Sequence, residues 1–154
     1  MSSNIFTIGY GNRSIQAFIQ LVKKYEIEIV IDVRTNPFSR YNPDYRISKF
    51  ELHLINNDVT YLFLGKELGG KPADQSCYSK GEVDYKKIQN KVFFIEGIEQ
   101  VIALERGGYR IALMCAEASP LDCHRKALIG DFLNEKGFDV SHIDKDGSIL
   151  NQLF

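Results

Sequence analysis

The sequence predicts a three-layer α/β domain of the Rossmann-like type, with a mostly parallel sheet of about five strands and helices on both faces. Strand patterns alternate with helix patterns throughout the chain. The segment 27–33, IEIVIDV, is apolar enough to be buried on both faces, which is typical of a strand inside a parallel sheet. A second apolar run ends at Cys115 and leads through a short loop into a helix pattern.

Length and composition indicate one domain over residues 1–154. An apolar fraction of 44% and a charged fraction of 25% are ordinary for a globular protein. The net charge of −1 gives no overall reason to bind nucleic acid, although a local basic surface could do so. We find no leader pattern and no apolar run near the roughly 18 residues that span a bilayer. We therefore expect a cytoplasmic protein that does not enter a membrane.

The cysteine content predicts free thiols. Three cysteines without paired spacing argue against a disulfide framework and for a reducing compartment. Neither CxxC nor HxxxH spacing is present, so we expect no metal site and no cofactor.

The first half of the chain contains three strand patterns, over 4–8, 27–33 and 59–64. The first leads through Gly9-Tyr10-Gly11-Asn12 into a helix over about 14–25. That glycine turn either brings backbone N–H groups close to a phosphate or is only a tight connection. The second strand ends at Asp32 and Arg34, and Asp32 either caps the next loop or takes part in catalysis.

The segment 34–49 places basic residues among aromatic ones. Two Asn-Pro pairs forbid a continuous helix or strand, so we expect an ordered loop that enters a helix near Asp44. We expect this helix to end near residue 57. Arg40 could pair with a phosphate while Tyr41 stacks on a base. The alternative is a solvated loop whose aromatic side chains cover the edge of the core.

The second half begins with a long loop over 65–83, which we expect to act as a lid or to be partly disordered. Asp84 is a suitable N-cap for helical segments that run through Arg106 and are broken or bent near Gly97. Gly107-Gly108 ends this helical region. A last strand over 138–143, a turn at 144–147 and a segment over 149–154 that packs back onto the sheet complete the chain.

The segment 109–130 organises the rest of the chain. Its apolar strand ends at Cys115, and Ser119-Pro120 are the residues preferred at the start of a helix. We expect that helix to carry its apolar stripe at Leu121, Leu128 and Phe132, with His124 and Arg125 in its first turn.

Polar and glycine residues follow several strands at one edge of the predicted sheet. Gly9, Asp32, Arg34, Gly65 and Cys115 each end or follow a strand, and open α/β sheets bind ligands at this carboxyl edge. We therefore predict a site there. Its candidate catalytic residues are Glu117, Asp32, Cys115 and His124, and its candidate substrate-binding residues are Gly9, Tyr10, Asn12, Arg34, Arg40, Tyr41 and Arg125.

Four segments in the same order resemble a bacterial and archaeal family known as domain of unknown function 488: TIGYGN at 7–12, IDVRTNPFSRYNP at 31–43, LGG at 68–70 and MCAEASPLDCHR at 114–125. The resemblance covers essentially the whole chain and implies a small intracellular α/β domain. Family members often have Gly-His-Ser where this chain has Gly9-Tyr10-Gly11. A looser similarity links Asp32-Val33-Arg34 and Cys115 to rhodanese-like and cysteine-phosphatase domains, but here nine residues separate Cys115 from Arg125.

Three functions are compatible with these residues. The first is an enzyme that acts on a phosphate-bearing substrate, a nucleotide or nucleic acid, with Arg34, Arg40 and Arg125 on the phosphate and Glu117 as the base. The second is sulfur or phosphoryl transfer by a Cys115 thiolate. The third is non-enzymatic binding of single-stranded nucleic acid by the loop at 34–49. The expected partners are a phosphate-bearing small molecule or nucleic acid and no membrane, with a homodimer left open.

Overall fold

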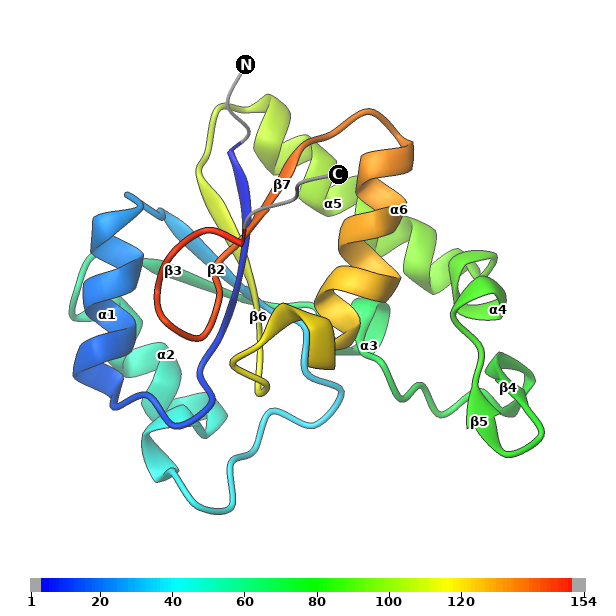
Figure 1. The fold of residues 1–154 in the computed structure, drawn as a ribbon, viewed down its shortest axis with the longest axis horizontal. Helices are drawn as coiled ribbons and strands as arrows, with labels where there is room; N and C mark the ends of the chain where they lie inside the picture. The colour runs from blue at the N-terminus through cyan, green and yellow to red at the C-terminus, as the bar shows by residue number, and fades with distance from the viewer. Residues whose placement is uncertain (1–3, 151–154) are drawn as a thin grey trace.

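The computed structural model describes residues 4–150 and has a five-stranded parallel sheet at its centre, in the order β3-β2-β6-β1-β7 (Figure 1). Its strands are β1 (Ile5–Gly9), β2 (Ile29–Asp32), β3 (Thr60–Phe63), β6 (Ile111–Cys115) and β7 (Val140–His142). The central strands β1, β2 and β6 are buried along their whole length, because helices cover both of their faces. The predicted fold class and its mostly parallel sheet are confirmed.

Two hydrophobic cores lie on opposite faces of the sheet. On one face, α1 (Ile15–Lys24) and α2 (Ile47–Ile55) pack against the sheet through Phe18 and Phe50. On the other face lie α3 (Gly65–Leu68), α5 (Val92–Arg106) and α6 (Asp131–Glu135), and Figure 1 shows the two groups of helices on either side of the strands. Successive side chains of a strand point to opposite faces of the sheet, so they enter the two cores in turn.

Helix α1 forms as its sequence pattern predicts. The Ser14 hydroxyl oxygen accepts a 3.1 Å hydrogen bond from the Ala17 N–H, which satisfies one of the unpaired groups at the start of the helix. The residues at helical spacing, namely Ile15, Phe18, Ile19 and Val22, are all buried.

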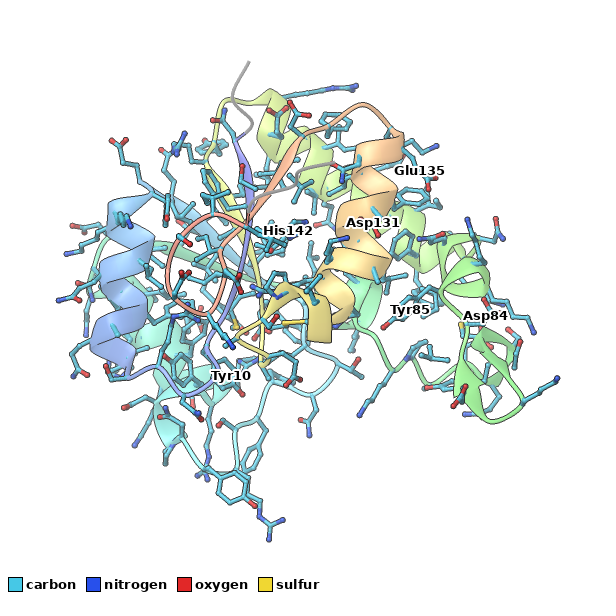
Figure 2. All side chains as sticks on the ribbon, in the orientation of Figure 1. Tyr10, Asp84, Tyr85, Asp131, Glu135 and His142 are labelled. Carbon is cyan, nitrogen blue, oxygen red and sulfur yellow. A yellow bond between two sulfur atoms is a disulfide. The ribbon has the colours of Figure 1, made fainter. Side chains whose placement is uncertain are left out.

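The helical region after Asp84 breaks at a different place from the one predicted. Asp84 lies just before α4 (Tyr85–Gln89), as Figure 2 shows, and caps this helix by accepting hydrogen bonds from the Lys86 and Lys87 N–H groups. The break falls between Gln89 and Val92, and Gly97 lies inside the continuous helix α5. Gly97 instead lets α5 pack closely on α3, because a Cβ there would come within 3 Å of the Leu68 side chain of α3.

The long connection over 65–83 contains local structure of its own. After α3 come η2 (Gln75–Cys77), a 3₁₀ turn, and a small antiparallel hairpin of β4 (Tyr78–Ser79) and β5 (Glu82–Val83). Cys77 is buried in the core on the α5 face, which fastens the connection to the domain.

The segment after Cys115 differs from the single helix that we predicted. Pro120–Asp122 forms only one 3₁₀ turn, η3, and Ser119 makes no side-chain capping bond. Cys123 is extended, with φ −132° and ψ 146°, so helical hydrogen bonding stops there and resumes in η4 (Arg125–Gly130), a π-helical segment that continues into α6. This interruption rotates the apolar stripe, so that Leu128 is buried but Leu121 is 70% exposed.

The chain after β7 turns back as expected. Gly147 adopts a φ of +87° in the turn, and Ile149 forms an antiparallel bridge with Ile143. The rest of the predicted final segment, 151–154, lies outside the described residues. Within 4–150, no helix has both the length and the apolar character needed to cross a membrane.

Candidate functional site

A cavity of about 400 Å³ lies at the carboxyl edge of the sheet. Its wall comes from the segments that follow β1, β2, β3 and β6, together with Val83 and Tyr85, which lie at the end of β5 and the start of α4. The lining residues are Tyr10, Arg34, Thr35, Asn36, Phe38, Gly70, Lys71, Val83, Tyr85, Cys115, Ala116, Glu117, Cys123 and His124. A cavity of this size is in the range that holds small molecules.

The topology of the sheet explains why the cavity lies here. The chain leaves β1 and β2 toward the face with α1 and α2, but it leaves the intervening strand β6 toward the face with α6. Neighbouring connections therefore diverge at the carboxyl ends of these strands and leave a crevice between them. The glycine turn after β1 closes against the loop after β6: the N–H groups of Tyr10 and Gly11 donate to the carbonyls of Cys115 (3.1 Å) and Ala116 (2.7 Å).

Arg34 is the best-fixed cation of the cavity wall. Its Nε and Nη2 donate to the Asp32 carboxylate at 2.9 and 2.8 Å, and its Nη1 donates to the Tyr45 carbonyl at 2.7 Å. Burial acts to lower the pKa of Arg34, but the hydrogen bonds and charge of Asp32 outweigh it and raise that pKa. The guanidinium also lies against the Tyr10 ring, 5.5 Å from its centroid.

Lys71 and Glu117 place opposite charges on the cavity wall, and both are exposed. Lys71 is held by its backbone, because its N–H donates a 3.0 Å hydrogen bond to the Thr35 hydroxyl oxygen. This bond ties the segment after α3 to the loop after β2. The long connection over 65–83 therefore contributes to the cavity wall.

His124 is fixed by the end of β2. Its Nε2 lies 2.9 Å from the Val33 carbonyl oxygen, which can only accept, so we assign the ring proton to Nε2. Gly70 packs directly on the ring, because a Cβ at that position would lie 2.9 Å from Cγ of His124. Burial and the nearby Arg125 charge lower the pKa of His124, while the Val33 carbonyl acts to raise it. The ring is therefore neutral at pH 7.

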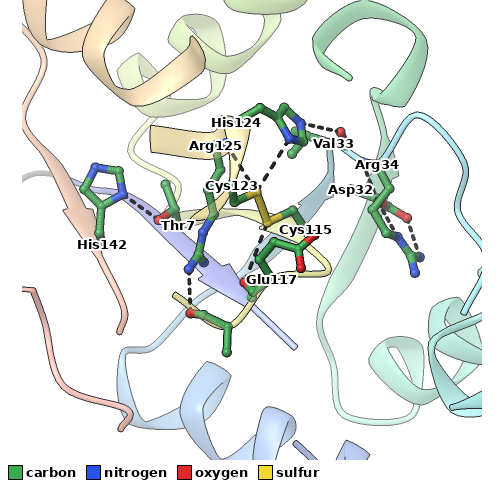
Figure 3. The surroundings of a disulfide bond; sticks show 12 residues. Thr7, Asp32, Val33, Arg34, Cys115, Glu117, Cys123, His124, Arg125 and His142 are labelled. Atoms are coloured by element: carbon green, nitrogen blue, oxygen red, sulfur yellow. Dashed lines mark hydrogen bonds and ion pairs between the residues drawn. A yellow bond between two sulfur atoms is a disulfide. The ribbon is translucent and has the colours of Figure 1, made fainter. Parts of the chain in front are cut away.

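Cys115 and Cys123 form a disulfide, which corrects our prediction of free thiols (Figure 3). The extended backbone at Cys123 carries its Sγ back to the end of β6, eight residues away in the sequence. The continuous helix that we predicted after Ser119 does not contain this extended residue. Cys77 remains a free, buried thiol.

Arg125 is completely buried beside this disulfide. Its Nη2 donates a 2.8 Å hydrogen bond to the Ala118 carbonyl, whereas its Nε and Nη1 have no hydrogen-bond partner among the described residues. Burial lowers the pKa of Arg125 to about 9. His142 is also buried: its Nδ1 lies 2.7 Å from the Thr7 hydroxyl oxygen (Figure 3), and burial together with the Arg125 charge lowers its pKa to about 4.

Five of the eleven candidate site residues line this one cavity: Tyr10, Arg34, Cys115, Glu117 and His124. Asp32 lies behind Arg34 as its ion-pair partner, and Gly9 packs against the Glu117 backbone. Arg125 lies buried behind the wall, while Asn12, Arg40 and Tyr41 are exposed outside it. No group of three or more His, Cys, Asp or Glu side chains within 4–150 is arranged to hold a metal ion.

Sequence reasoning missed several members of the wall: Thr35, Asn36, Gly70, Lys71, Tyr85 and Cys123. Thr35 and Asn36 directly follow Arg34, so their position after a strand was an available signal. Lys71 and Tyr85 come from regions whose path cannot be derived from local patterns. Tyr10 follows β1 and Tyr85 begins α4, so two distant segments of the sequence supply these rings (Figure 2).

The sheet order and the cavity at its switch point define a doubly wound α/β protein with a cavity at its carboxyl edge. The chain belongs to the family described as "Domain of unknown function DUF488", whose model matches residues 14–132. The match contains α1 through the start of α6 and nearly all of the cavity wall. Neither the curated proteins nor the solved structures gave a match, and the looser similarity to rhodanese-like domains is not supported.

Proposed function

We propose that this protein binds and chemically transforms a phosphate-bearing small molecule, a nucleotide or a nucleotide-like compound, in the cavity at the carboxyl edge of the sheet. One observation carries the proposal: a single cavity brings two cations, Arg34 and Lys71, together with the carboxylate residue Glu117 and several aromatic rings. Cations bind phosphate oxygens, and aromatic faces stack on bases.

The residues divide the work by position. Lys71 is exposed and supplies the charge that binds a phosphate, while Arg34, whose charge is balanced by Asp32, is a fixed donor-rich part of the wall. The exposed Phe38 ring and the Asn36 amide supply stacking and hydrogen bonding to a base. Glu117 is the proposed general base, which takes a proton from an attacking water or hydroxyl.

We also propose the cytoplasm as the compartment, where a Cys115–Cys123 bond would be transient.

Calorimetric titration with inorganic phosphate, nucleoside monophosphates and a short single-stranded oligonucleotide tests this proposal. We expect at least one phosphate compound to bind, and Lys71→Ala to weaken its binding about tenfold, as for loss of one charge-assisted hydrogen bond. Lys86→Ala is the matched control, because Lys86 is an exposed lysine on α4 outside the cavity wall. Failure of all these compounds to bind, or equal effects of the two variants, would contradict the proposal.

Binding of single-stranded nucleic acid without catalysis is the second candidate, favoured by one feature outside the cavity. Tyr41 is 90% exposed, and the Arg40 guanidinium lies 5.8 Å from the centre of its ring. An exposed aromatic ring beside a cation is the arrangement that stacks on bases without sequence preference. In this case the oligonucleotide alone would bind, Tyr41→Ala would weaken its binding, and Lys71→Ala would not.

A further inference from the structure

We propose that Cys115 and Cys123 are a redox-active pair that exchanges with a low-molecular-mass disulfide entering the cavity, with Cys123 as the attacking thiol and Cys115 as the resolving thiol. The two sulfur atoms are bonded in the structure (Figure 3), and both residues belong to the cavity wall. This activity is separate from the phosphate chemistry proposed above and does not depend on it.

The surroundings of the two sulfur atoms differ, and this difference assigns the roles. The Arg125 backbone N–H donates to Cys123 Sγ at 3.4 Å. Cys115 Sγ instead lies 3.8 Å from the Glu117 carbonyl oxygen. A donor beside a sulfur stabilises its thiolate, whereas an acceptor stabilises the protonated thiol.

His124 is positioned to take the proton from Cys123. Because Nε2 donates to the Val33 carbonyl, Nδ1 of the neutral ring carries the lone pair, and Nδ1 lies 3.5 Å from Cys123 Sγ. Access favours the same residue, since Cys123 is 8% exposed and Cys115 is 2% exposed. Cys77 is buried in the core and does not line the cavity, so it takes no part.

The reaction starts from the reduced protein and a disulfide RSSR. The Cys123 proton passes to His124 Nδ1 as Sγ attacks RSSR, so that a Cys123–SR bond forms, the S–S bond of RSSR breaks, and RS⁻ leaves and takes the proton from His124. Cys115 Sγ then attacks Cys123 Sγ and displaces the second RS⁻, which is protonated by the proton that Cys115 loses. The protein dithiol is oxidised to the Cys115–Cys123 disulfide, and RSSR is reduced to two RSH.

The cavity also suggests the chemical class of RSSR. Lys71 is an exposed cation on the same wall as the two cysteines, whereas the charge of Arg34 is already balanced by Asp32. A disulfide with a carboxylate that pairs with Lys71 therefore fits better than a neutral one. Glutathione disulfide is therefore the probe to use.

The test starts from the fully reduced chain, treats it with glutathione disulfide, and maps each cysteine by mass spectrometry over time. The unaltered protein should form the Cys115–Cys123 bond and retain no glutathione. Cys115→Ser should hold one glutathione on Cys123, and Cys123→Ser should be modified at Cys115 about tenfold more slowly. Cys77 serves as the internal control and should stay unmodified. Equal rates in the two variants, or faster modification of Cys115, would overturn the assignment of roles.

A titration of the unaltered protein in glutathione buffers tests the pair without any substitution. The two thiols should disappear together as the ratio of oxidised to reduced glutathione rises, because they form one two-electron couple. Thiols that disappear independently, or that stay free at every ratio, would overturn the proposal.

Discussion

The Asp32 carboxylate and the Arg34 guanidinium form an ion pair through two parallel hydrogen bonds of 2.9 and 2.8 Å, and both side chains are almost fully buried. The Tyr61 hydroxyl donates a further 2.7 Å hydrogen bond to Asp32. A buried, bidentate pair of this kind fixes the loop after β2 on the strand that precedes it.

Removal of one partner of this pair should therefore destabilise the fold strongly. We expect Arg34→Met to lower the free energy of unfolding by about 3–5 kcal/mol, because it leaves a buried carboxylate unpaired. Urea denaturation measures the change. The double variant with Asp32→Asn should recover part of the loss, since it removes the orphaned charge. A loss below about 1 kcal/mol for Arg34→Met would contradict a structural role for the pair.

Stability should fall in mild acid because of His142. Its pKa is about 4 in the folded protein against an ordinary value of 6.5, so the unfolded chain binds more protons between these values. The neutral His142 ring therefore contributes to the free energy of unfolding. This contribution is fully present above about pH 6.5, and about 3 kcal/mol is lost as the pH falls toward 4. His124, whose pKa is also lowered, adds a contribution of the same sign.

Urea unfolding between pH 4 and pH 7 measures this dependence. His142→Gln should flatten it, whereas His53→Gln should not, because His53 lies at the surface beside Asp44. An unchanged slope in His142→Gln would show that other groups cause the loss.

Gly9 should tolerate no side chain. A Cβ at this position would overlap the backbone carbonyl of Glu117, which cannot move without opening the turn that packs on it. We expect Gly9→Ala to cost about 2–3 kcal/mol in thermal or urea unfolding. Gly107→Ala is the control: Gly107 has φ −75°, and a Cβ there would make only ordinary van der Waals contacts at 3.4 Å or more, so this change should be neutral or slightly stabilising. Equal effects at the two positions would contradict the close packing at Gly9.

Substitution of Glu117 should impair catalysis but leave substrate binding nearly unchanged. We expect Glu117→Gln to lower the turnover of a bound phosphate compound at least about 100-fold, because the amide cannot accept a proton, while the affinity changes little. Phosphorus NMR of the reaction mixture and calorimetry provide the two measurements. Glu99→Gln, an exposed position on α5 outside the cavity wall, is the matched control. Full turnover in Glu117→Gln would exclude Glu117 as the base.

Local sequence patterns were sufficient to predict most of the helices and strands. The apolar runs of β1, β2 and β6 and the spaced apolar residues of α1 predicted those elements directly, because burial and periodicity act over a few neighbouring residues. The patterns failed around Cys123, where preferred helix-starting residues were followed by an extended residue and a π-helical segment. Tertiary contacts prevail there: Cys123 bonds to Cys115, and the ring of His142 packs on Gly130.

The sequence by itself determined the α/β class, the family and the edge of the sheet at which a site should lie, since residues that end parallel strands gather at one edge. Only the tertiary structure decided which side chains share the cavity. It pairs Arg34 with Asp32, buries Arg125 behind the wall, brings Lys71 in from a long connection and joins Cys123 to Cys115. These outcomes depend on distances between segments far apart in the chain, and periodicity within a segment carries no information about them.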